Sequence, residues 1–108
     1  MTDAVSELSI VIVTWKGDGI LVNCLRSIRK VYGDLPEIVV VDNAASEETH
    51  KLVTGFEGVK YVSSPGNPGF AGGNNIGVRE TTMPYILLLN NDTVVHGDSF
   101  SPLIEFLK

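Results

Sequence analysis

Two carboxylates in this 108-residue sequence lie at or just after the ends of short hydrophobic runs. Asp92 closes the triplet Asn90-Asn91-Asp92 after one run, and Asp42 ends another. A hard cation such as Mg²⁺ or Mn²⁺ often uses only one or two carboxylates, and it completes its shell with water and the phosphates of a substrate. Asp92 beside two carboxamides is therefore sufficient for a shared metal site, though not for a site that holds metal alone.

Asp42 allows two interpretations. A carboxylate at the end of a parallel strand commonly accepts hydrogen bonds from the ribose hydroxyls or the base N–H of a nucleotide. Aspartate is also a favoured turn residue, so Asp42 can instead cap the turn ahead of the next helix. Residue type and position do not separate these two roles, and both stay open at this point.

The most unusual stretch is Asn67-Pro68-Gly69-Phe70-Ala71-Gly72-Gly73-Asn74-Asn75-Ile76-Gly77. It holds four glycines between residues 69 and 77, and glycines that run into a helix allow close backbone approach and offer free N–H groups. Six of the seven asparagines lie in or just after turns that follow hydrophobic runs. Turn chemistry explains any single asparagine, but four such turns at one edge of a sheet indicate a polar site.

These residues need a sheet that brings the turns together. Three hydrophobic runs do not alternate with polar residues, which predicts strands covered on both faces of a parallel sheet: 9–15, 37–42 and 85–90. A weaker run at 59–62 alternates and fits an edge strand. Helical patterns lie between the runs, at 20–32, from the N-cap Ser46 to Gly55 or Gly58, and within 71–81. The order β-α-β-α-β-α-β predicts an α/β, Rossmann-like, mostly parallel sheet with helices on both faces.

Composition and charge exclude several classes. A chain with 44% hydrophobic and 19% charged residues is not disordered, and its length allows one domain. The net charge of -5 argues against nucleic-acid and anionic-membrane partners. Cys24 is the single cysteine, so no intrachain disulfide forms. The longest hydrophobic runs are far too short for a transmembrane segment, and the acidic start is unlike a signal peptide, which together predict a cytoplasmic chain.

Two nucleotide-binding motifs fit poorly or not at all. Gly17-Asp18-Gly19-Ile20-Leu21-Val22 resembles the dinucleotide fingerprint, but Val22 replaces the third glycine. Asp18 would also place a negative charge where a pyrophosphate sits. No P-loop sequence occurs, and His50 and His96 have no partners at zinc-ligand spacing.

The order and spacing of the motifs resemble the N-terminal, donor-binding half of family 2 glycosyltransferases of the GT-A fold, particularly the rhamnosyltransferase-like members. The likeness covers about residues 9–95 and is carried by four segments: Ile10–Thr14, Val39–Asn43, the glycine-rich stretch 67–77 and Leu88–Asp92. It implies that residues 1–108 are the nucleotide-sugar-binding portion of a glycosyltransferase domain truncated at its C-terminus.

The resemblance also implies residue roles. Asp92 would reach a Mg²⁺ or Mn²⁺ ion, and nucleotide-sugar contacts are expected from Thr14, Trp15, Asp42, Asn43, Gly69, Asn75 and Asn91. The sequence departs from the family pattern at three positions. Asn90 replaces the first Asp of the Asp-x-Asp motif, which bears on metal dependence. Lys16 and Asn74 stand where many relatives carry Asn and Arg.

The activity implied is inverting transfer of a sugar from a nucleoside diphosphate donor, such as a UDP- or dTDP-sugar, to a hydroxyl acceptor on a glycan or lipid-linked sugar. The general base is expected beyond Lys108, so the 108-residue chain itself is expected to be inactive. A longer parent protein would act in the cytoplasm or at the inner face of the membrane. Two alternatives remain: a non-catalytic nucleotide-binding module and, ranked lower, a dinucleotide-dependent oxidoreductase domain.

The sequence also predicts self-association through residues 84–108. The run Tyr85–Leu89 is strongly hydrophobic and contains no charged residue or proline, which are the usual protections of an exposed sheet edge. Leu103–Leu107 adds a hydrophobic helical face beside it. A homo-oligomer built around these residues is therefore expected.

Overall fold

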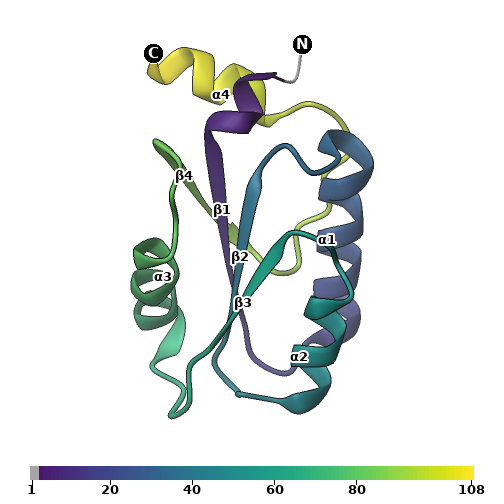
Figure 1. The fold of residues 1–108 in the computed structure, drawn as a ribbon, viewed down its shortest axis with the longest axis vertical. Helices are drawn as coiled ribbons and strands as arrows, with labels where there is room; N and C mark the ends of the chain where they lie inside the picture. Colours follow the sequence, from purple (N-terminus) through teal and green to yellow (C-terminus); the bar gives the residue numbers. More distant parts are fainter. Residues whose placement is uncertain (1–2) are drawn as a thin grey trace.

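The computed structural model describes residues 3–108, and these form a four-stranded parallel sheet with helices on both faces (Figure 1). The strands stand in the order β3-β2-β1-β4. Their bounds are β1 (Leu8–Thr14), β2 (Glu37–Asp42), β3 (Val59–Ser63) and β4 (Tyr85–Asn90). The helices are α1 (Asp18–Tyr32), α2 (Glu47–Thr54), α3 (Gly69–Arg79) and α4 (Phe100–Leu107), after a 3₁₀ turn η1 (Asp3–Glu7). This arrangement confirms the predicted fold class and element order.

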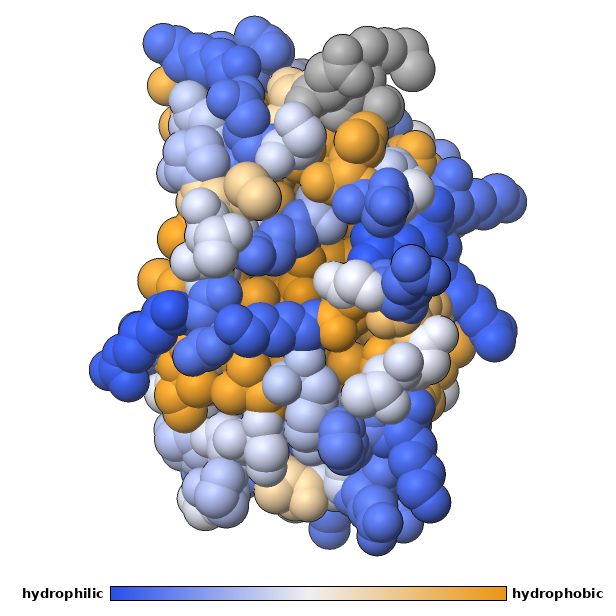
Figure 2. All heavy atoms as spheres, in the orientation of Figure 1, coloured by the Kyte–Doolittle hydropathy of each residue, from blue (hydrophilic) through white to orange (hydrophobic). Residues whose placement is uncertain are grey.

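The two faces of the sheet pack against different helices. α1 and α2 cover one face and α3 covers the other, as Figure 1 shows. Because side chains alternate along a strand, β1 and β2 supply both cores. The α1/α2 core includes Ile10, Ile12, Ile38 and Val40, and the α3 core includes Val11, Val13, Val39 and Val41. Figure 2 shows hydrophobic atoms at the centre of the molecule in this view and mostly hydrophilic atoms around its rim.

Local signals set the helix ends. Gly33 ends α1 with a φ of 63°, a conformation that glycine adopts without steric cost. Ser46 caps α2 by accepting a hydrogen bond from the Thr49 N–H at 3.3 Å, as predicted, and Gly55 ends that helix. α3 begins at Gly69, two residues earlier than residue 71, because the chain turns into the helix directly after Pro68.

Two glycines of the glycine-rich stretch have a packing role. A Cβ added at Gly73 would lie 2.8 Å from Val13 Cγ1, and one added at Gly77 would collide with Val11 Cγ1. Both glycines therefore let α3 lie close to β1 and β2. The prediction that the glycines mark close backbone approach is confirmed at these positions, and the approach there is to the sheet.

β4 differs from its prediction. The run was expected to be covered on both faces, but β4 is an edge strand that pairs with β1, and the exposed fractions of Ile86 and Leu88 are 43% and 50%. These side chains lie on the α3 face, where α3 packs on β1 and β2 instead. The weaker run at β3 is the other edge strand, as predicted.

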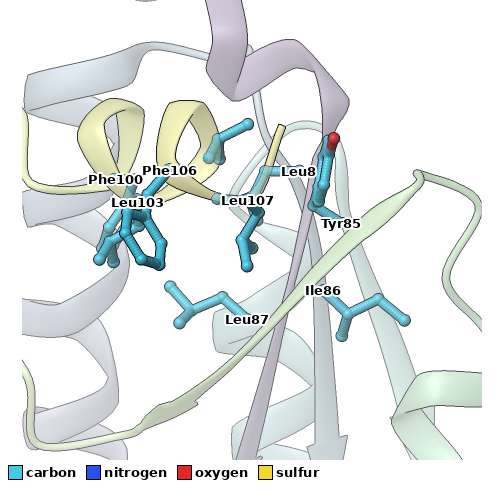
Figure 3. A pocket seen from close by; sticks show the side chains of 9 residues that line it. Leu8, Tyr85, Ile86, Leu87, Phe100, Leu103, Phe106 and Leu107 are labelled. Carbon is cyan, nitrogen blue, oxygen red and sulfur yellow. The ribbon is translucent and has the colours of Figure 1, made fainter.

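An apolar groove of about 230 Å³ lies between α4 and the amino-terminal ends of β1 and β4 (Figure 3). Its lining is hydrophobic throughout: Leu8, Tyr85, Ile86, Leu87, Phe100, Leu103, Ile104, Phe106 and Leu107. The groove is at the opposite end of the sheet from the strand ends that carry the predicted site residues. None of the helices in residues 3–108 has the length and hydrophobicity needed to cross a bilayer.

The close contact of α3 makes a stability prediction. Replacing Gly77 with Ala should lower the free energy of unfolding by about 1–3 kcal/mol, because the new Cβ overpacks against Val11 and lies 3.0 Å from Val41 Cγ2. Gly19→Ala is the matched control, since a Cβ at this position in α1 meets nothing within 4 Å. Urea denaturation should show a gain or no change for Gly19→Ala, and equal stability of both variants would contradict the packing role.

The groove and the β4 edge make a second prediction. We propose that the 108-residue chain self-associates there, with a second copy of the chain as the partner. Five exposed side chains belong to these two features: Leu103 54%, Phe106 87% and Leu107 65% on α4, and Ile86 43% and Leu88 50% on the α3 face of β4.

Light scattering over a concentration series tests the self-association. Leu88→Lys should shift the chain toward the 11.7 kDa monomer, because a charged side chain blocks edge pairing. Ile20→Lys is the control, since Ile20 is 51% exposed but lies on α1. A wild-type chain that stays monomeric at high concentration would show that this surface does not bind a second copy.

Candidate functional site

A hollow of about 380 Å³ lies at the carboxyl ends of β1, β2 and β4, the lower end of the sheet in Figure 1. Figure 2 shows mainly hydrophilic and intermediate atoms at this end of the molecule. The hollow is lined by Val13, Thr14, Trp15, Asn43, Asn67, Phe70 and Asn91. Four of the predicted nucleotide-sugar residues are therefore brought together: Thr14, Trp15, Asn43 and Asn91.

The parallel register explains why these residues meet. Val13 of β1 is opposite both Val41 of β2 and Asn90 of β4, so the three strands end level with one another. The turns that follow carry the next residues to the same edge. At this edge the Asn91 side-chain N–H donates to Thr14 Oγ1 at 3.1 Å, which ties the turn after β4 to the end of β1.

Asn43 has an unsatisfied acceptor in the hollow. Its side chain is 4% exposed, and its Nδ2 donates to the Gly69 carbonyl at 2.9 Å. Its Oδ1 is buried and has no hydrogen-bond partner within the described part of the chain. A buried acceptor without a partner costs free energy, so a ligand N–H or O–H that reached this atom would be favoured. The predicted residue Gly69 holds Asn43 in place through its carbonyl, and it has a φ of 84° at the start of α3.

Two aromatic side chains in the hollow are unusually exposed. Trp15 is 51% exposed and Phe70 is 55% exposed. Lys16 has a φ of 54° and places its Nζ 4.6 Å from the centroid of the Trp15 ring, within the range of a cation–π contact. Exposed aromatic faces are suited to stack on a planar ring of a ligand. Phe70 and Asn67 were not among the predicted site residues; the signal available for both was their place in the glycine-rich stretch.

Asp42 does not line this hollow. It is fully buried and shares its face of β2 with Val40, whereas Asn43 contacts α3 on the other face. Its Oδ1 accepts from the Ala44 N–H at 3.0 Å, and its Oδ2 accepts from the Ser46 N–H at 2.9 Å and the Tyr61 hydroxyl at 2.7 Å. The turn-capping role of Asp42 is thus present in the structure, and contact with a nucleotide stays a prediction.

Asp92 and Asn75 also lie outside the lining of the hollow, and both are exposed. Burial, and in second place the negative charge of Asp92, raises the pKa of the Cys24 thiol in α1 to about 11. The thiol donates to the Asn90 carbonyl at 4.0 Å and so lies under the turn that carries Asp92. Residues 3–108 contain no cluster of three or more His, Cys, Asp or Glu side chains that would hold a metal by themselves.

The bonds around Asp42 generate a prediction. Asp42→Ala should lower the free energy of unfolding by about 2–4 kcal/mol, because two backbone N–H groups and the Tyr61 hydroxyl lose their acceptor together. Asp34→Ala is the control, since Asp34 is exposed. Chemical denaturation measures both variants, and a loss for Asp42→Ala no larger than that for Asp34→Ala would contradict the capping role.

The chain is similar to known glycosyltransferases. Its residues 9–108 match the family model described as glycosyl transferase family 2. It is 34% identical over 101 residues to the low-salt glycan biosynthesis hexosyltransferase Agl10 of Haloferax volcanii, covering 90% of this chain and 31% of Agl10. It is 28% identical over 75 residues to the poly-beta-1,6-N-acetyl-D-glucosamine synthase of Staphylococcus epidermidis, covering 67% of this chain and 18% of that enzyme.

Solved structures of S. aureus TarS have the same fold. The structure of TarS 1–349 superposes with a TM-score of 0.80 at 17% identity, covering 93% of this chain and 32% of the TarS chain. The structure of the same TarS segment with UDP gives a TM-score of 0.71 at 17% identity, covering 93% of this chain and 31% of that one. The chain thus spans about a third or less of the length of these relatives. With nearly all of its residues matched by the family model, the chain belongs to glycosyl transferase family 2.

Proposed function

We propose that residues 1–108 form the donor-binding portion of a glycosyltransferase and bind a nucleoside diphosphate sugar at the carboxyl edge of the sheet. The observation that carries the proposal is the hollow whose lining combines Asn43, with its buried and unpaired Oδ1, and two exposed aromatic side chains. A ligand with a planar ring and hydrogen-bond donors satisfies both features. The complex of TarS with UDP supports a uridine nucleotide, since TarS has the same fold.

The two sides of the sheet edge supply different contacts in this proposal. On the α3 side, Trp15 and Phe70 pack against the ligand and Asn43 accepts a hydrogen bond from it. On the α2 side, Asp42 accepts a hydrogen bond from the base. Thr14 ends the strand between the two sides and is hydrogen-bonded to Asn91, so these two residues hold the floor of the site. Gly69 and Asn75 belong to α3, whose first turn adjoins the hollow.

A divalent cation fits the turn after β4 as a shared ligand. The chain offers one carboxylate, Asp92, beside the carboxamides of Asn90 and Asn91. Mg²⁺ commonly binds through one or two carboxylates plus the phosphates of its substrate, so this donor set is adequate when the diphosphate is present. Mg²⁺ or Mn²⁺ would then act as a Lewis acid toward the departing diphosphate. The donor set is too small for a site that binds metal without nucleotide, in agreement with the absence of a larger cluster among the described residues.

Transfer itself is proposed to invert the configuration at the sugar carbon. The acceptor hydroxyl attacks this carbon as the bond to the diphosphate breaks, and a general base takes the hydroxyl proton. We assign no residue of this chain to that base, and Agl10, of which the chain covers 31%, has further sequence to supply one. Hydrolysis or transfer by the 108-residue chain alone is therefore not required by the proposal.

A nucleotide-binding module without catalysis is the second candidate. Such a module would bind the nucleotide in the same hollow through the same contacts, but a longer chain that contains it would not transfer a sugar. Assay of a longer chain with donor and acceptor separates the two candidates. The family match removes the earlier alternative of a dinucleotide-dependent oxidoreductase domain, in agreement with Val22 at the third glycine position.

Calorimetric titration with UDP and dTDP, with and without Mn²⁺, tests the proposal. Asp92→Asn should abolish the Mn²⁺-dependent part of nucleotide binding, because it removes the carboxylate of that turn. Asp42→Asn should weaken binding by about tenfold with or without metal, since the loss of a charged hydrogen bond is worth about 1.5 kcal/mol. Asp34→Asn is the control for charge alone.

Each outcome decides one part of the proposal. Retention of full Mn²⁺ dependence in Asp92→Asn would remove Asp92 from the metal site. Unchanged affinity in Asp42→Asn would leave Asp42 as a turn cap alone. The absence of any stabilisation or heat of binding with both nucleotides would contradict donor binding by these residues.

A further inference from the structure

The carboxylate of Asp42 is closed to solvent. Its exposed fraction is 0%, and three donors occupy its two oxygens: the Ala44 N–H, the Ser46 N–H and the Tyr61 hydroxyl. Because no part of Asp42 is exposed, a nucleotide reaches its carboxylate only if one of the groups that cover it moves. The three donors differ in how much fold stability is lost when each one moves away from the carboxylate.

The two backbone donors are part of the local turn. Ala44 and Ser46 are two and four residues after Asp42, and Ser46 is also the N-cap of α2. Moving either N–H away from the carboxylate would break the turn and uncap the helix. These bonds keep the carboxylate in place whether or not a ligand is bound.

Tyr61 is placed differently. It lies on β3, an edge strand, and its ring is only partly buried. The ring stacks on the exposed His50 of α2, with centroids 4.5 Å apart and an interplanar angle of 27°. Rotation of the Tyr61 side chain breaks its hydrogen bond to Asp42, its stack on His50 and its packing against the α1/α2 core, but it leaves the backbone of β3 and of the turn unchanged.

We infer that Tyr61 is a positioning residue that covers Asp42 and competes with the nucleotide for its Oδ2 atom. In the free protein the phenol hydroxyl donates to the carboxylate; on binding, an N–H or O–H of the nucleotide takes its place. This inference rests on the proposed role of Asp42 in nucleotide binding. It adds that the structure is the closed form of the Asp42 side of the site.

The chemistry of the pair agrees with this role. Partial burial and the adjacent carboxylate of Asp42 raise the pKa of Tyr61 to about 12, so the phenol keeps its proton at neutral pH. The hydroxyl is then a donor to an ionised acceptor, the stronger class of hydrogen bond. Its loss should have opposite effects on folding and on binding. The free protein is stabilised by the bond, whereas nucleotide binding has to break it.

Tyr61→Phe separates these effects. The variant should unfold at lower temperature than the wild type and should bind UDP about three- to tenfold more tightly, because the bond that closes Asp42 is absent. Tyr32→Phe is a matched control: the Tyr32 hydroxyl also donates to an aspartate, Asp98, at 2.9 Å, but it lies away from the hollow. This control should lose stability with no change in UDP affinity.

His50→Ala provides a second variant that leaves the Tyr61–Asp42 hydrogen bond in place. Removing the stacked ring favours rotation of Tyr61, so UDP affinity should rise by about twofold. Titration calorimetry with UDP measures affinity, and thermal unfolding without ligand measures stability. Tighter UDP binding by both Tyr61→Phe and His50→Ala supports the competition.

Failure of this inference differs from failure of the proposed function. Equal or weaker UDP binding by Tyr61→Phe, together with weaker binding by Asp42→Asn, would overturn the competition and keep Asp42 as a nucleotide contact. Unchanged binding in Asp42→Asn would overturn both the contact and the competition. No UDP binding by the wild-type chain would overturn the proposed function, and the inference with it.

Discussion

The carboxyl edge of this domain depends on the burial of β1. Every residue of β1 is buried, with β2 and β4 on either side in the sheet and helices on both faces. This position fixes the register of its neighbours, so that Thr14 is level with Asp42 and Val13 is level with Asn90. A slip of one residue would exchange the two faces and move every polar residue of the edge to the wrong side. The hydrophobic core therefore sets the geometry of the site.

The packing of α3 links the same core to the hollow at the carboxyl edge. Gly73 and Gly77 bring the helix close to Val13 and Val11, and this approach places the first turn of α3 beside Asn43. A helix with larger residues at these two positions would be displaced from the sheet. The Gly69 carbonyl would then move away from Asn43 Nδ2, and Phe70 would move with it. One segment thus serves both packing and the site, which explains why its glycine content exceeds the needs of a turn.

The sequence was sufficient to predict features that depend on local chemistry, such as strands and helix caps. It was insufficient to predict burial that depends on which other elements pack nearby. Unbroken hydrophobic runs predicted β1 and β2, and Ser46 predicted the start of α2, because strand burial and capping are visible in residue type. β4 has an equally hydrophobic run but is exposed on one face, since the extent of α3 and not the composition of β4 decides what covers it. The place of Phe70 in the lining of the hollow was not predicted, because an exposed aromatic ring is recognised only when its surroundings are known.

The adjacent residues Asp42 and Asn43 are a second case in which the surroundings, and not the residue type, decide the role. Both follow the same hydrophobic run, and both were assigned to one nucleotide site. The period of two along a strand sends them to opposite faces, so Asn43 opens into the hollow beside α3 while Asp42 faces α2 and Tyr61. A ligand that contacts both must cross the ends of β1 and β2. Thr14, which is opposite Asp42 at this edge, is only 2% exposed and therefore projects little into the path of the ligand. On the α3 side the Asn43 Oδ1 atom is buried without a partner, and on the α2 side the Tyr61 hydroxyl occupies Asp42. In the proposed complex a ligand therefore gains an unpaired acceptor on the first side and has to replace an existing donor on the second.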